Sequence, residues 1–202
     1  MSQPDRIFPP RSPAATLALT PIVKALAHSE INPGREGTAA SSLTVMGAPP
    51  YTTTRLGKLY QGDPLPVVTE ATAYYPAGAV TFGVEGRALF SDGDDAPWAG
   101  GPTLHVFETA TGLEHLRFDI FPGEEHYHYL TPGVQNHWVG FDSVADGDFL
   151  EWVIDRVRHK LSHLLRFAGA TGLADEVNAL TVGEVLDTVE EHLRQSNLQL
   201  HG

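Results

Sequence analysis

Five of the ten histidines in this 202-residue chain lie close together in the sequence. They fall within residues 105–137, where an even distribution would place about two. Imidazole nitrogens joined by a carboxylate oxygen are typical ligands of first-row transition metals. Two histidines and one carboxylate leave coordination positions open for substrate or oxygen, and three histidines suit zinc. The cluster therefore predicts a site for a divalent transition metal, Fe, Mn or Zn.

The preferred ligands are His126 and His128, because alternate residues of an extended strand point to the same face of a sheet. His137 or Glu124 would complete the ligand set. His105, on a neighbouring strand, is a further candidate ligand. All five carry a nitrogen or oxygen that binds transition metals.

Two further side chains have the chemistry to act on a bound molecule. Arg117 or Tyr127 could orient an anionic small-molecule substrate, so both are candidate catalytic residues. The sequence therefore indicates a His-rich metal-binding protein, and a small-molecule metalloenzyme is one form that it could take.

Readings without a metal remain open. Tyr127 and Tyr129 alternate with the histidines, which also fits a strand that is exposed or faces another subunit. His105 and His115 could simply hydrogen-bond across neighbouring strands, beside Arg117 and Asp119. The cluster could also bind a ligand or catalyse a reaction without any metal.

The histidines belong to a predicted β-hairpin at residues 103–130. Two alternating runs flank Ala110-Thr111-Gly112, which fits a three-residue loop with a left-handed glycine. The resulting register places four pairs of residues opposite one another: Leu104 and Phe118, His105 and Arg117, Val106 and Leu116, and Phe107 and His115.

The predicted fold class is α+β, with an antiparallel sheet over about residues 66–130 covered by two C-terminal helices. Residues 66–75 and 79–90 read as strands, and residues 131–145 as a loop. Asp148 and Glu151 have capping-box spacing, and apolar residues recur after them with helical period as far as about Gly169. Thr181 and Glu184 mark the start of the second helix.

Residues 1–65 are expected to form an irregular Pro-rich arm, and residues 66–202 the α+β domain. Ten of the fifteen prolines lie in residues 1–70, where they interrupt helices and ladders. One short helix is expected from Pro21, capped by Thr20. Such an arm suggests a second function: a non-catalytic accessory or structural subunit that wraps a second copy of itself or a larger enzyme.

Composition and net charge limit the kinds of partner and metal site that the sequence predicts. The net charge of −12, and the lack of a basic stripe, argue against nucleic acid. The absence of cysteine excludes disulfides and thiolate metal sites. No apolar run is long enough for a signal peptide or a membrane span, so a cytoplasmic protein is expected.

Two resemblances accompany these patterns. GEEHYHYLTPG, residues 123–133, partly resembles the first cupin motif, and PGVQNH, residues 132–137, loosely resembles the second. GGPTLHVF, LRFDIF and HYHY together resemble the core of an uncharacterised bacterial family over about residues 78–170. This second resemblance implies that the histidine strand belongs to the family's core.

Overall fold

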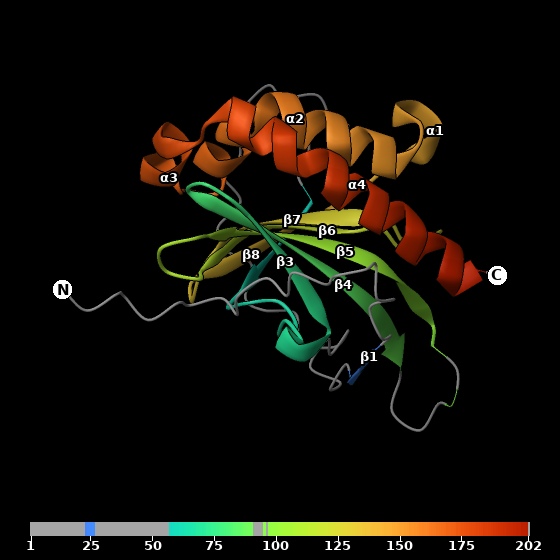
Figure 1. Cartoon of the computed structure of the whole chain (residues 1–202). Coiled ribbons are helices and arrows are strands. Elements are labelled where there is room, and N and C mark those ends of the chain that lie inside the picture. The colour runs from blue at the N-terminus through green and yellow to red at the C-terminus, as the bar shows by residue number, and fades with distance from the viewer. Residues whose placement is uncertain (1–22, 27–56, 91–94, 96, 202) are drawn as a thin grey trace.

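The chain forms two layers, a twisted β-sheet and a layer of helices across one of its faces (Figure 1). The structure is a computed structural model that describes residues 23–26, 57–90, 95 and 97–201. The α+β class predicted from the sequence is confirmed, with the helices at the C-terminal end of the chain.

The sheet extends further than residues 66–130. Its strands are β1 (Val23–Leu26), β2 (Lys58–Gln61), β3 (Thr72–Ala77), β4 (Val80–Phe90), β5 (Ala99–Glu108), β6 (Glu114–Asp119), β7 (His126–Thr131) and β8 (Gln135–Gly140). Strands β4, β5, β6, β7, β8 and β2 are neighbours in that order and antiparallel. The other side of β4 pairs with β3, antiparallel, and with β1, parallel.

The prediction of a loop over residues 131–145 is wrong for Gln135–Gly140, which form strand β8. Pro132 and Gly133 instead form a tight turn, in which the Val134 amide donates to the Thr131 carbonyl and Gly133 has a φ of 70°. The chain therefore returns at once beside β7. The strand expected at residues 66–75 begins later, at Thr72, after a short 3₁₀ turn, Thr69–Ala71.

The predicted hairpin between β5 and β6 has the expected register at three of the four pairs. A β-bulge between Val106 and Phe107 shifts the fourth, so Phe107 pairs with Glu114 rather than with His115. Gly112 has a φ of 72°, the left-handed conformation expected of the glycine in this loop.

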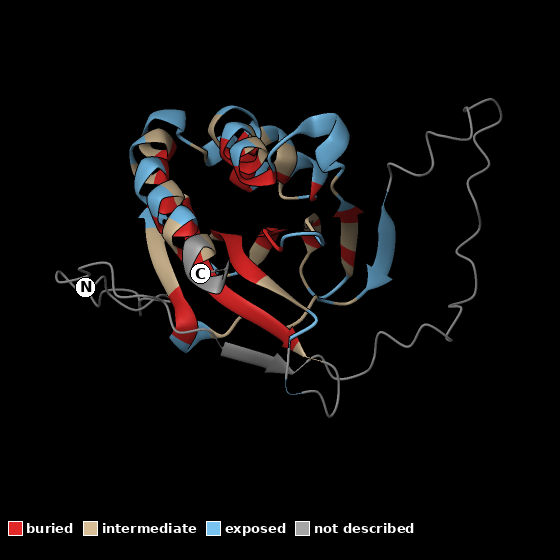
Figure 2. Ribbon diagram, turned by 90° about the vertical axis from the view of Figure 1, so that its right-hand side faces the viewer, coloured by how far each residue is buried: buried red, intermediate tan, exposed pale blue. Residues whose placement is uncertain are grey.

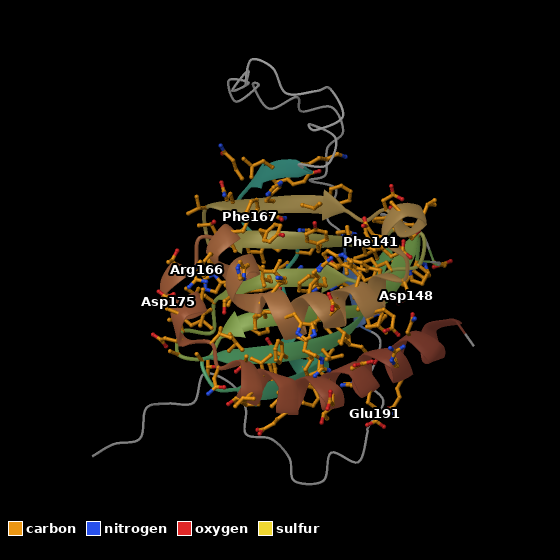
Figure 3. The ribbon with its side chains drawn as sticks, turned by 90° about the horizontal axis from the view of Figure 1, so that it is seen from above. Phe141, Asp148, Arg166, Phe167, Asp175 and Glu191 are labelled. Carbon is orange, nitrogen blue, oxygen red and sulfur yellow. The ribbon has the colours of Figure 1, made fainter. Side chains whose placement is uncertain are left out.

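Four helices follow the sheet: α1 (Ser143–Asp146), α2 (Phe149–Phe167), α3 (Thr171–Glu176) and α4 (Ala179–His201). The Asp148 carboxylate caps α2 by accepting from the Glu151 amide at 2.9 Å, as the sequence predicts. The predicted cap of the second long helix is wrong, because Asn178 caps α4 through the Leu180 and Thr181 amides. Arg166 of α2 pairs with Asp175 of α3 (Figure 3).

The apolar core lies between α2, α4 and the face of the sheet that they cover (Figure 2). It contains residues from both layers: Val80, Phe82, Val84, Leu104, Val106, Leu116 and Phe118 from the sheet, and Val153, Val157, Leu161, Leu165, Val182, Leu186, Val189 and Leu193 from the helices. Within the described part of the chain, no helix is long and apolar enough to cross a bilayer.

Little of the predicted N-terminal arm lies within the described residues. The helix expected after Thr20 is wrong at Val23–Leu26, which form strand β1. Strand β3 pairs with β4 only as far as Glu85, and β4 continues to Phe90. The backbone of β1 pairs with this last part of β4, Arg87–Phe90. Backbone pairing at this free stretch of β4 overrides the local helix signal. The remainder of residues 1–56 falls outside the described ranges, and the domain boundary stays a prediction.

Two leucines of α4 test this packing. Leu186 is fully buried in the core, whereas Leu180 is 79% exposed. Leu186→Ala should lower the free energy of unfolding by about 2 to 5 kcal/mol, because it leaves a cavity. Leu180→Ala should change it by less than about 0.5 kcal/mol. Urea denaturation followed by circular dichroism measures both, and equal effects would contradict the helix orientation described.

Candidate metal centre

The face of the sheet turned away from the helices is polar. Because cross-strand partners share a face, the register aligns Glu85 of β4, Thr103 of β5, Asp119 of β6 and His126 of β7 in one row. Glu85, Thr103 and Asp119 are buried, and His126 is partly buried. Buried polar groups need hydrogen-bond or charge partners, so each contact on this face matters for stability.

Three side chains from β6 and β7 converge in this row. Asp119 Oδ2 lies 3.2 Å from His126 Nε2 and 3.1 Å from His128 Nε2. One donor atom from each of the three residues lies within 4.8 Å of the other two. The two imidazoles come from alternate positions of β7 and pack edge to face, with ring centroids 5.0 Å apart. The Nε2 atoms of both imidazoles therefore contact the same carboxylate oxygen.

Each member of this triad is oriented by a second hydrogen bond. His126 Nδ1 donates to the Glu124 carbonyl at 2.7 Å, and the Thr103 hydroxyl donates to Asp119 Oδ1 at 2.7 Å. His128 Nδ1 lies 2.6 Å from the side-chain oxygen of Asn136. Because the Glu124 carbonyl only accepts hydrogen bonds, the proton of His126 must lie on Nδ1. Outer partners of this kind are typical of metal-binding histidines.

With the proton of His126 on Nδ1, its Nε2 lone pair faces the Asp119 carboxylate, so a positive charge is needed between these two atoms. Burial disfavours the imidazolium of His126, but the hydrogen bond to Asp119 and the charge of Asp119 outweigh it, so the pKa of His126 is raised. Burial likewise disfavours the carboxylate, but hydrogen bonds from both imidazoles hold the pKa of Asp119 well below its usual range. A metal cation between these atoms would supply the same charge and displace protons.

Two of the distances within the triad fit a shared metal ion. Two donors that each lie about 2.1 Å from one ion, at tetrahedral or octahedral angles, are about 3.0 to 3.4 Å apart. The carboxylate oxygen of Asp119 lies 3.1 and 3.2 Å from the two imidazole nitrogens. These two distances are therefore compatible with an ion shared by the three residues.

Three of the side chains singled out in the sequence lie away from this triad. His137 pairs with Tyr129 across β7 and β8, on the face that the helices cover, and its ring lies 5.9 Å from that of Phe167. Tyr127 is on the same face, with its ring 5.1 Å from Trp152. Glu124 is exposed in the turn before β7 and contacts the site through its backbone carbonyl.

His105 and Arg117 belong to a second buried polar group beside the triad. His105 Nδ1 lies 2.6 Å from Glu114 Oε1, and its Nε2 lies 3.3 Å from Glu85 Oε2. Arg117 binds both oxygens of Glu114, at 2.9 and 2.7 Å. Arg117 is the cross-strand neighbour of His128, but its guanidinium forms an ion pair with Glu114.

This second group fastens a segment of backbone, Leu65–Val68, across the polar face. Arg117 donates to the Leu65 carbonyl at 2.8 Å, and Arg87 donates to the Pro66 carbonyl at 3.0 Å. The Val68 amide donates to Glu85 at 3.2 Å. The side chains of Glu85, Arg87 and Arg117 thus bind the backbone segment that helps to cover them.

The spacing of the histidines does not identify Asp119 as a ligand. The predicted hairpin puts Asp119 beside His105 and Arg117 rather than with the histidines of β7. The signal that could have found it is Phe121-Pro122-Gly123-Glu124, whose turn is closed by a hydrogen bond from the Glu124 amide to the Phe121 carbonyl. This turn returns β7 beside β6, so that Asp119 and His126 become partners.

One family model matches the chain, over residues 74–193, and its description is a domain of unknown function, DUF7700. The matched range runs from β3 into α4 and includes all three members of the triad. No curated protein and no solved structure matches the chain.

The buried Glu85 carboxylate should make stability depend on pH. Burial raises the pKa of Glu85, but interactions with His105 and Arg87 lower it from 4.5 to about 2. A carboxyl with a depressed pKa stabilises the fold above its unfolded pKa and loses that effect as the pH falls through the folded pKa. Glu85→Gln should therefore cost about 3 kcal/mol at pH 7, and its deficit relative to wild type should shrink between pH 4.5 and 2.

Urea denaturation at a series of pH values measures this difference. Glu184→Gln, which changes an exposed carboxylate on α4, is the matched control and should leave stability nearly unchanged at every pH. A Glu85→Gln deficit that stays constant down to pH 3 would show that the charge of Glu85 is not what stabilises the fold.

Proposed function

The chain belongs to the DUF7700 family, and we propose that it binds one divalent transition metal ion through Asp119, His126 and His128. The observation that carries this proposal is the approach of one Asp119 oxygen to both Nε2 atoms, at 3.1 and 3.2 Å. The outer hydrogen bonds to Glu124 and Asn136 already turn these nitrogens toward the carboxylate. The ion is Fe, Mn or Zn, because imidazole with carboxylate suits these metals.

Three protein ligands leave coordination positions for water or a small molecule. When bound, zinc would acidify a coordinated water, and iron would support oxygen chemistry. The protein's own part is to hold the two imidazoles in the correct tautomer and to keep the Asp119 carboxylate ionised. A small-molecule metalloenzyme is the form of this function that an open two-His, one-carboxylate set supports best.

A non-catalytic accessory subunit is the alternative. In it, the triad only ties β6 to β7 through its imidazole–carboxylate hydrogen bonds, with protons in place of a metal. Its binding surface would be the N-terminal arm, which lies mostly outside the described residues. Metal content separates the two functions.

Metal titration tests the proposal. Protein purified without a histidine tag and stripped with chelator should take up about one equivalent of Zn²⁺, Co²⁺, Mn²⁺ or Fe²⁺, measured by calorimetry and elemental analysis. Asp119→Asn and His128→Ala should each weaken binding by at least about 100-fold, because each removes a ligand. Uptake below about 0.2 equivalents for every metal would exclude this function.

Tyr127→Ala is the matched control. Tyr127 lies between the two histidines on the same strand but faces α2, so its loss should leave metal affinity unchanged. It should instead lower the free energy of unfolding by about 1 to 3 kcal/mol through lost packing. A Tyr127→Ala protein that loses its metal while remaining folded would contradict the assignment of the two faces.

A further inference from the structure

A lysine stands beside the metal triad, on the exposed edge strand of the sheet. Lys58 of β2 pairs with Trp138 of β8, and Trp138 pairs with His128 of β7. Cross-strand partners share a face, so all three side chains stand on the polar face. All four residues of β2 are exposed (Figure 2).

The indole of Trp138 forms a wall next to the triad. Gly140 is the cross-strand partner of His126, and a Cβ atom at Gly140 would lie 3.0 Å from the Trp138 ring. The indole therefore lies over Gly140, and its centroid is 5.3 Å from that of the His126 imidazole. A flat apolar surface thus borders the triad on the side of β8.

The ammonium of Lys58 lies over this indole, with Nζ 5.4 Å from the ring centroid. The Trp138 centroid is in turn 5.3 Å from that of His126. The same indole is therefore the neighbour of both the Lys58 ammonium and the His126 imidazole. A lysine on β2 can therefore reach a small molecule that is bound at the triad.

None of the carboxylates that the structure describes forms an ion pair with Lys58, in contrast to the arginines of this face. Arg87 binds Glu85, and Arg117 binds Glu114, so both guanidiniums are neutralised. The chain as a whole is acidic, with a net charge of −12. An unpaired ammonium next to a cation site in such a protein favours an anionic ligand there.

We propose that the triad and Lys58 together bind a small dicarboxylate. One carboxylate occupies the open positions of the metal, the other binds the Lys58 ammonium, and the carbon chain between them packs on Trp138. This inference rests on the proposed metal site and names the class of molecule that the site accepts. A ligand with one carboxylate can satisfy the metal or the lysine, but not both.

Cobalt-loaded protein makes the inference measurable, because ligand binding to Co²⁺ changes its visible absorption. Succinate is the probe and acetate the one-carboxylate comparison. Succinate should bind wild type at least about tenfold more tightly than acetate. Lys58→Met should weaken succinate binding by about tenfold and leave acetate binding unchanged, whereas Lys58→Arg should retain it. Lys160→Met, which removes an exposed lysine from α2, should have no effect.

The outcomes separate this inference from the metal site itself. All variants should bind Co²⁺ with wild-type affinity and stoichiometry, since none removes a ligand. Stoichiometric Co²⁺ binding, with succinate affinity indifferent to Lys58 or equal to that of acetate, would overturn the dicarboxylate and leave the metal site standing. Failure of wild type to bind Co²⁺ or any other metal would overturn both.

Discussion

Burial of charge on one face of the sheet is the constraint on which the rest of the structure depends. The helices supply an apolar cover for only the other face. Carboxylates that are taken out of water on the polar face must each meet a cation, since an unpaired buried charge costs several kcal/mol. Glu85 meets Arg87, Glu114 meets Arg117, and Asp119 lies between two imidazoles. The register between β6 and β7 brings Asp119 beside its imidazoles, whereas each carboxylate–arginine pair lies within one strand.

The same constraint explains why the triad is well prepared for a cation. Burial strengthens each electrostatic interaction and penalises each unpaired group. Thr103, the Glu124 carbonyl and Asn136 take up the remaining hydrogen-bonding capacity of the triad, so the atoms left facing one another are those that need a positive charge. Protons and a metal ion are the two ways to supply it. The affinity of the site for metal therefore depends on how readily its protons leave.

Local patterns were enough to predict β4, three pairs of the β5–β6 hairpin and the Asp148 cap of α2. Alternation, a left-handed glycine and a capping side chain act within a few residues. The sequence could not reveal pairings between distant segments: β1 with β4, β2 with β8, or Asp119 with His126. His137 shows the difficulty. Its face is set by the length of the turn at Pro132-Gly133, which decides whether it stands opposite His128 or Tyr129.

The two histidines of the triad have outer partners of different kinds, with a consequence for how the sequence can drift. His126 donates to a main-chain carbonyl, which every amino acid at position 124 supplies. His128 is oriented by the carboxamide of Asn136, for which few other side chains can substitute. Replacement of Glu124 would therefore preserve this hydrogen bond, whereas replacement of Asn136 would remove the side-chain partner of His128. Divergent members of the family that keep the two histidines should therefore vary more at position 124 than at position 136.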